Sequence, residues 1–115
     1  MVWMILGVLA LVLSYVVIQG VRAAHGLAQA RRRLSTYDVQ TAKLSYGDIT
    51  YLDEGTGEVI LSVHGMFGGY DQAYETVKTR RSKNRLIAPS RFGYLGSDVK
   101  GDGSPKEQAD AFAEL

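Results

Sequence analysis

The sequence predicts an N-terminal membrane helix followed by an α/β domain. Three observations support this prediction. Residues 1–21 contain no charged side chain. Residues 37–63 contain short runs rich in β-forming residues, separated by glycine-containing turns. From residue 58 onward a strand pattern alternates with a helical pattern, as is typical of α/β folds.

Residues 1–21 are predicted to form a single transmembrane helix. The run from residue 2 to residue 18 is apolar except for Gly7, Ser14 and Tyr15. A helix of about 20 residues rises ~30 Å, which is enough to cross the hydrocarbon core of a bilayer. Apolar side chains surround this helix on all sides, so a soluble amphipathic helix is not expected.

A cleaved secretory signal is the alternative, and it would make the rest of the chain a secreted protein. Ala28-Gln29-Ala30 resembles a small-residue cleavage site. Signals usually begin with basic residues and have a shorter apolar core. No Lys or Arg precedes the apolar run here. The composition therefore favours the anchor over the signal.

Residues 22–36 are predicted to be a basic juxtamembrane linker that continues the helix. The segment contains Arg22 and Arg31-Arg32-Arg33, and residues 23–34 are mostly good helix formers. Positively charged flanks tend to stay on the cytoplasmic side. We therefore expect a single-pass protein with a cytoplasmic domain. The arginines can also contact anionic membrane lipid, each contributing roughly 1 kcal/mol near the surface.

Three strands are expected at the start of residues 37–115. Residues 39–46 and 48–53 are the first two, with Gly47-Asp48 as a tight hairpin turn. Residues 58–63 form the third, and their near-continuous apolar run suits a central strand covered on both faces. A glycine-rich loop, residues 64–69, follows. Its glycines are expected to adopt positive φ and to approach a ligand closely, and its free N–H groups can hold a developing negative charge.

A helix, a strand and a second helix are expected after this loop. Residues 71–78 place Ala73, Tyr74 and Val77 on one stripe. Residues 78–85 are a charged, solvated stretch, residues 86–88 a strand stopped by Pro89, and residues 90–103 a loop.

The second helix opens with a capping box at Ser104-Pro105-Lys106-Glu107. Its expected apolar face is Ala109, Phe112 and Ala113. No stop signal closes the helix before Leu115. We therefore expect residues 37–115 to be an incomplete domain.

In these motifs the chain resembles the α/β-hydrolase family, specifically bacterial members with an N-terminal membrane helix. The matching segments follow one another in order over residues 37–115. They are residues 51–57 (YLDEGTG), 64–72 (HGMFGGYDQ), 85–97 (RLIAPSRFGYLGS) and 104–110 (SPKEQAD). Many relatives begin the third motif with Asp where this sequence has Ser90. The resemblance implies the first strands and helices of the α/β-hydrolase fold, truncated before the nucleophile elbow.

The resemblance also implies roles for the glycine-rich loop. The backbone N–H of Met66, with Phe67 beside it, would be a donor of the oxyanion hole. His64, Gly65, Gly68 and Gly69 would support the loop, with His64 structural rather than catalytic. The family nucleophile sits in G-x-S-x-G, and no serine here has glycine at both flanking positions. No nucleophile, acid or base is therefore expected within residues 1–115.

The resulting hypothesis is an N-terminal portion of a membrane-anchored serine hydrolase that acts on an ester or related acyl substrate. Epoxide hydrolase, dehalogenase and cofactor-free peroxidase activities occur on the same fold. The alternative is a non-enzymatic short membrane protein, or a degenerate hydrolase-fold protein that binds a partner. In either case we expect the chain as given to be inactive. We also expect residues 37–115 alone to be poorly soluble or molten, because their third strand would be an exposed apolar edge.

The composition limits other kinds of site. The chain has 115 residues, of which 46% are hydrophobic and 22% charged, as in ordinary globular proteins. It has no cysteine, so disulfides, thiolate nucleophiles and cysteine-based zinc sites are excluded. With only two histidines, no metal site is expected, and no cofactor is expected either. The net charge of +1 gives no indication of a nucleic-acid partner.

Overall fold

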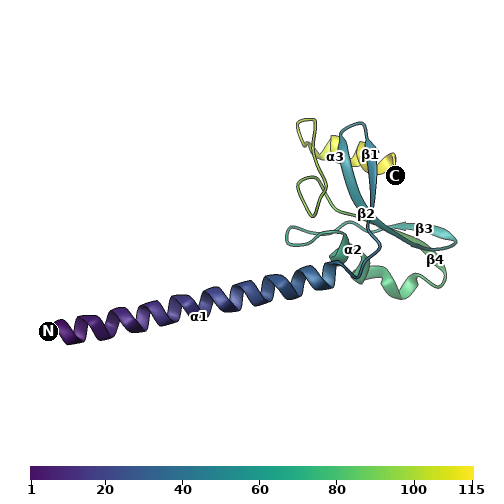
Figure 1. Ribbon diagram of the computed structural model, residues 1–115. Helices are drawn as coiled ribbons and strands as arrows, with labels where there is room; N and C mark the ends of the chain where they lie inside the picture. Colours follow the sequence, from purple (N-terminus) through teal and green to yellow (C-terminus); the bar gives the residue numbers. More distant parts are fainter. The chain divides into compact units, whose positions relative to one another are not determined.

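Helix α1 (Val2–Leu34) is one uninterrupted helix in the computed structural model, which describes residues 1–115 (Figure 1). It therefore runs through both the apolar stretch and the basic linker, as the sequence predicts. Its last turn contains Arg31, Arg32 and Arg33, and cations at this end interact favourably with the helix dipole. Residues 1–36 form one compact unit and residues 37–115 another.

By length and composition, α1 is able to cross a membrane. It is 33 residues long, and none of its residues is buried within the protein. A signal sequence near an N-terminus has the same length and apolar composition. The existence of a long apolar helix is thus confirmed, whereas its orientation stays a prediction.

The second unit is built on a mixed four-stranded sheet in the order β1-β2-β4-β3. Strand β2 is antiparallel to both of its neighbours, and β3 is parallel to β4. The chain passes from β3 to β4 through α2, so these two strands form a crossover unit. The bounds are β1 (Gln40–Leu44), β2 (Gly47–Gly55), β3 (Glu58–Leu61), α2 (Tyr70–Val77), η1 (Lys78–Arg80), β4 (Asn84–Pro89) and α3 (Pro105–Ala113).

The hairpin turn differs from the predicted one. Leu44 pairs with Gly47, so the two-residue loop is Ser45-Tyr46 rather than Gly47-Asp48. Gly47 is the first residue of β2 and has a φ of +134°. A Cβ there would lie 2.8 Å from the carbonyl oxygen of Asp98. The glycine is thus required by the segment that follows β4, which passes close to the strand.

Strand β3 is not the central strand that its apolar sequence predicts. It pairs only with β4 and ends at Leu61, although the N–H of Ser62 still donates to the Ile87 carbonyl at 2.9 Å. The side chains of Val59, Leu61 and Val63 remain 52%, 46% and 45% exposed. The expectation of an exposed apolar edge is therefore confirmed. The run is apolar, but no other strand or helix of residues 37–115 covers it.

The core lies between the sheet and α2. Leu52 and Ala88 are directly paired neighbours of β2 and β4 and are fully buried. Tyr70, Ala73 and Tyr74 supply the buried face of α2, close to the predicted stripe.

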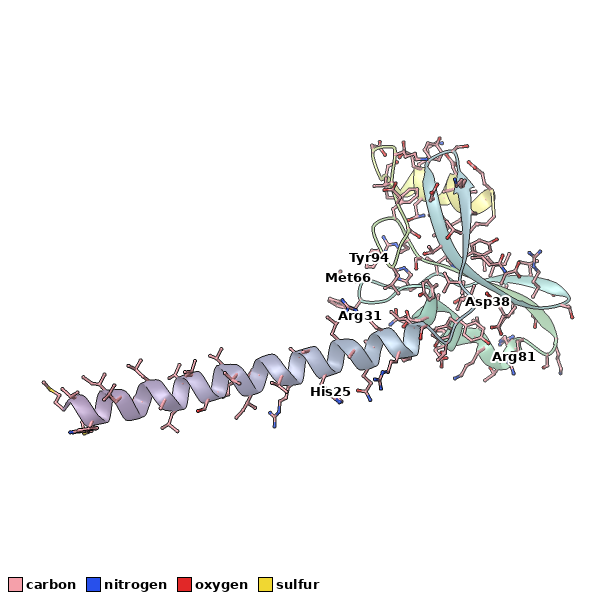
Figure 2. All side chains as sticks on the ribbon, viewed as in Figure 1. His25, Arg31, Asp38, Met66, Arg81 and Tyr94 are labelled. Carbon is pink, nitrogen blue, oxygen red and sulfur yellow. The ribbon has the colours of Figure 1, made fainter.

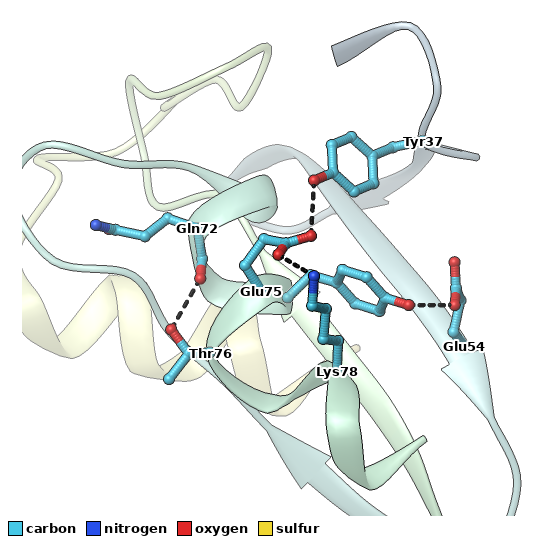
Figure 3. Close-up of polar contacts among 7 residues, drawn as sticks. Tyr37, Glu54, Gln72, Glu75, Thr76 and Lys78 are labelled. Atoms are coloured by element: carbon cyan, nitrogen blue, oxygen red, sulfur yellow. Dashed lines mark hydrogen bonds and ion pairs between the residues drawn. The ribbon is translucent and has the colours of Figure 1, made fainter. Parts of the chain in front are cut away.

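Polar contacts also tie α2 to the residues around it (Figure 3). Tyr37 donates to Glu75 at 3.1 Å, Tyr74 donates to Glu54 at 2.6 Å, and Lys78 lies 2.5 Å from Glu75. Burial, with the hydrogen bond to Glu54, raises the pKa of Tyr74 above its usual value.

Helix α3 begins as predicted but turns a different face inward. The Ser104 hydroxyl accepts a hydrogen bond from the Glu107 N–H at 3.3 Å, which is the expected N-cap. However, Ala111 is buried while Ala109 and Ala113 are exposed. The Gln108 Oε1 accepts from the Phe92 N–H at 2.7 Å. This polar anchor turns the Gln108 side of the helix inward and displaces the predicted apolar face.

Candidate functional site

The loop between β3 and α2 carries the residues predicted to form an oxyanion hole. Met66 and Phe67 form its tip, and their side chains are 69% and 92% exposed. Neither backbone N–H donates to another backbone group. Met66 lies on the same side of the domain as Tyr94, which belongs to the loop after β4 (Figure 2). The loop therefore presents two unpaired backbone donors at the surface.

His64 connects these two loops. Its side chain is only 5% exposed, and its Nε2 accepts a hydrogen bond from the Arg91 N–H at 2.9 Å. Because Nε2 is the acceptor, Nδ1 carries the proton and donates to the Gly65 carbonyl oxygen at 2.7 Å. The ring also makes an edge contact with Tyr94, with centroids 4.8 Å apart.

These contacts define what His64 is able to do chemically. Both ring nitrogens are bonded to backbone groups, so neither is free to take a proton from a serine. Such contacts are those that a bracing residue needs. The structural role assigned to His64 from the family resemblance stays a prediction.

The glycines of the loop do not behave as the sequence predicts. None of Gly65, Gly68 and Gly69 has a positive φ. Gly65 has open space where a Cβ would stand. A Cβ on Gly69, in contrast, would lie 2.8 Å from Leu95 Cγ, and one on Gly68 would lie 2.8 Å from Gln72 Cβ. Close packing, rather than an unusual backbone conformation, is thus the reason for glycine at positions 68 and 69.

A buried hydroxyl cluster supports the loop after β4, and sequence reasoning missed it. Thr50, Ser90 and Ser97 are 9%, 0% and 7% exposed. The Ser97 Oγ donates to the Ser90 carbonyl oxygen at 2.8 Å and accepts from the Thr50 N–H at 3.0 Å. The Thr50 Oγ1 donates to the Leu95 carbonyl oxygen at 2.6 Å. Small polar residues at the end of an apolar strand were the only signal in the sequence.

Ser90 joins this cluster to α2, and Leu95 is strained within it. The Ser90 Oγ accepts from the N–H of Tyr70, the first residue of α2, at 2.9 Å. That N–H has no partner within the helix. Leu95 has a φ of +34°, a conformation that L-residues rarely adopt. The hydroxyl cluster therefore fixes the position of both loops around the candidate site.

Among the comparisons with known proteins, only the comparison with solved structures gives a match. No family model matches the chain. No curated protein matches it either. Among solved structures, a Klebsiella pneumoniae protein described as a "putative epoxide hydrolase" is 19% identical, with a TM-score of 0.54 over 66% of this chain. The fold is α/β-hydrolase-like in part. The match spans 28% of that structure's length.

This hydrolase-like portion contains no assembled catalytic machinery. The buried serines 62, 90 and 97 each donate to or accept from backbone groups, and none is hydrogen-bonded to His64. No group of three or more His, Cys, Asp or Glu side chains is arranged to hold a metal ion. The chemistry available at the loop is therefore binding of an oxygen acceptor by backbone N–H groups.

Proposed function

We propose that residues 37–115 are the N-terminal part of the catalytic domain of a membrane-anchored serine hydrolase. The unpaired N–H groups at Met66 and Phe67, presented after a strand at the loop tip, carry this proposal. They would stabilise the tetrahedral oxyanion that forms when a serine attacks an ester or related acyl carbonyl. The attacking serine, its base and the acid would lie outside residues 1–115.

The sheet supports this proposal. β3 has an unpaired edge, and one of its faces is uncovered and apolar. A parallel strand normally has neighbours on both sides and helices on both faces. In a complete domain the nucleophile strand would pair with β3 and bring the serine elbow beside the Met66 loop.

The N-terminal helix would anchor this domain to a membrane. An 18-residue window of α1 has a mean hydropathy of 2.4 and at most two charged residues. The arginines at its C-terminal end would remain on the cytoplasmic side and contact anionic lipid. A protease-protection assay tests this placement. Protease added to intact cells should leave residues 37–115 uncleaved, and cleavage should occur only after the membrane is permeabilised.

The decisive experiment uses the open reading frame from which the chain derives. We expect the 115-residue chain to have no nitrophenyl esterase activity. If the frame continues past Leu115 and encodes a G-x-S-x-G elbow, we expect its product to be active. In that protein Met66→Pro should lower kcat by about 10²–10³-fold, because it removes the oxyanion donor.

Met66→Ala is the matched control, since it shortens the side chain but retains the N–H. Equal losses in both variants would show that the side chain matters and the N–H does not. A frame that stops at Leu115 would reject the enzymatic proposal for this product.

A non-enzymatic hydrolase-fold protein that binds a partner is the second candidate. It is compatible with the hydrogen bonds of both His64 ring nitrogens to backbone groups, although the enzymatic proposal also expects no nucleophile–base pair within residues 1–115. A stop codon after Leu115, together with a stably folded 115-residue product, would select it.

A further inference from the structure

A basic segment, residues 78–83, follows α2 and forms η1 and the turn after it. It contains Lys78, Arg80, Arg81 and Lys83 and no acidic residue, and all of its residues are exposed. The Arg81 N–H donates to the Lys78 carbonyl oxygen at 3.3 Å, and the Lys83 N–H donates to the Arg80 carbonyl oxygen at 3.0 Å. These tight turns hold the cations close together at the end of α2.

The protein neutralises this basic segment only in part. Arg80 and Lys83 have no carboxylate within ion-pair distance. Lys78 and Arg81 each lie near a glutamate of α2 or β2, at 2.5 and 3.6 Å, but their side chains remain 48% and 65% exposed. Ion pairs with this much exposure contribute little to stability. Both cations are therefore able to exchange the glutamate for another anion at little cost.

The chain enters its second unit at α2, close to the basic segment. Tyr37 is the first residue of this unit. Its hydroxyl donates to Glu75 at 3.1 Å, and Glu75 also pairs with Lys78 at 2.5 Å (Figure 3). The Tyr37 ring makes edge contacts with two tyrosines of α2, at centroid distances of 6.2 and 6.0 Å. Only residues 35 and 36 separate α1 from this point, so the domain is tethered beside the basic segment.

The tether favours lipid as the anion that this segment meets. A membrane anchor at α1 keeps the domain at the bilayer, where lipid headgroups are present at high effective concentration. Phosphate oxygens accept charge-assisted hydrogen bonds from Lys and Arg. Near an anionic leaflet each such cation strengthens binding by roughly fivefold.

We propose that the basic segment binds the phosphate headgroups of anionic lipid and docks the domain on the membrane through η1. Arg80 and Lys83 supply charge that no protein group neutralises, while Lys78 and Arg81 exchange their glutamates for phosphate. The arginines at the end of α1 are then one lipid contact and the basic segment is a second, which fixes the orientation of the domain. This proposal rests on the membrane anchor of the proposed function but not on its catalysis.

The test is resonance energy transfer from the domain to lipid headgroups, with the full 115-residue chain in nanodiscs. The chain has no cysteine, so Thr79→Cys, at an exposed site of η1, takes a single donor dye, and the acceptor dye is on the headgroups. We expect more transfer in an equimolar mixture of phosphatidylglycerol and phosphatidylcholine than in phosphatidylcholine alone. The excess should disappear in about 1 M NaCl, where the Debye length is about 3 Å.

Two double variants identify the cations responsible. Arg80→Gln with Lys83→Gln should lower the docking equilibrium by roughly 25-fold, fivefold for each cation, and return the transfer to its level in phosphatidylcholine. Lys43→Gln with Lys100→Gln is the matched control. It removes two exposed lysines beside the β1–β2 hairpin and should leave the excess transfer unchanged.

Several results would overturn the proposal. Equal transfer in the two lipids is one, and equal effects of the two double variants is another. If millimolar inorganic phosphate removes the excess and NaCl of the same ionic strength does not, the segment is a site for free phosphate rather than for lipid. A chain that does not elute with the nanodiscs refutes the anchor and this proposal together, whereas the esterase assays test catalysis alone.

Discussion

At the residue scale, two glycines of the same loop have different reasons to be there. Gly65 faces open space, whereas Gly69 packs against the side chain of Leu95. The Leu95 backbone is fixed, because its carbonyl oxygen accepts a hydrogen bond from the buried Thr50 hydroxyl, so only the side chain of Leu95, which is 39% exposed, is able to move away. The sequence shows a glycine-rich loop but does not distinguish these roles, since the contact joins residues far apart in the chain.

We expect Gly69→Ala to destabilise the domain by about 1 kcal/mol, because the added methyl displaces the Leu95 side chain from its present rotamer. Gly65→Ala should change stability by no more than about 0.5 kcal/mol. Pulse proteolysis of the full chain in urea measures both. Equal effects of the two substitutions would show that the Leu95 contact does not constrain the loop.

At the element scale, local patterns predict the elements and long-range contacts set their details. The apolar runs predict β2, β4 and α2 to within a few residues. Each of these elements buries its apolar side chains against the others, so its position is visible in the local sequence pattern. The predicted position of the hairpin turn is wrong because Gly47 is needed for the close approach of the Asp98 backbone and not for the turn. The inward face of α3 was misassigned because Gln108 is bonded to Phe92. Both errors come from loops whose packing leaves no periodic signal.

The pairing of β2 with β4 includes an ion pair that should respond to acid. Arg85 donates to Asp53 through two hydrogen bonds of 2.8 and 2.5 Å. The hydrogen bond from Arg85 holds the pKa of Asp53 below its usual value of 3.8, against the opposing effect of burial. The folded state therefore gains stability from this pair above the unfolded pKa and loses it as the pH falls through the folded pKa.

Arg85→Met removes this contribution. We expect the unsubstituted chain to be more stable than the variant at neutral pH, and the difference to shrink as the pH falls below about 3.8. Urea unfolding at a series of pH values measures the difference, and Arg80→Met controls for the loss of an exposed arginine. A difference that grows on acidification would contradict the assignment.

At the scale of the whole molecule, the sheet is well covered on one side of its strand order and exposed at β3. One face is covered by α2, and the β2–β4 pairing is buried, yet β3 leaves an unpaired edge with two exposed apolar side chains, and a third, Val63, follows the strand. The apolar composition of β3 predicted burial, and the expected absence of a neighbouring strand predicted exposure. The second prediction is confirmed, because pairing partners decide burial more than composition does.

An exposed apolar edge promotes pairing between molecules, and charged residues at such edges oppose it. We expect residues 37–115 to self-associate, and Leu61→Lys to shift them toward the monomer, because Leu61 is 46% exposed on the uncovered face of β3. Thr79→Lys adds the same charge at an exposed site in η1 and should leave association unchanged. Sedimentation velocity over a concentration series measures the monomer fraction. If the unsubstituted segment is already monomeric, with a sharp cooperative thermal transition, β3 is stable as an edge strand and the strongest structural reason for expecting further strands is removed.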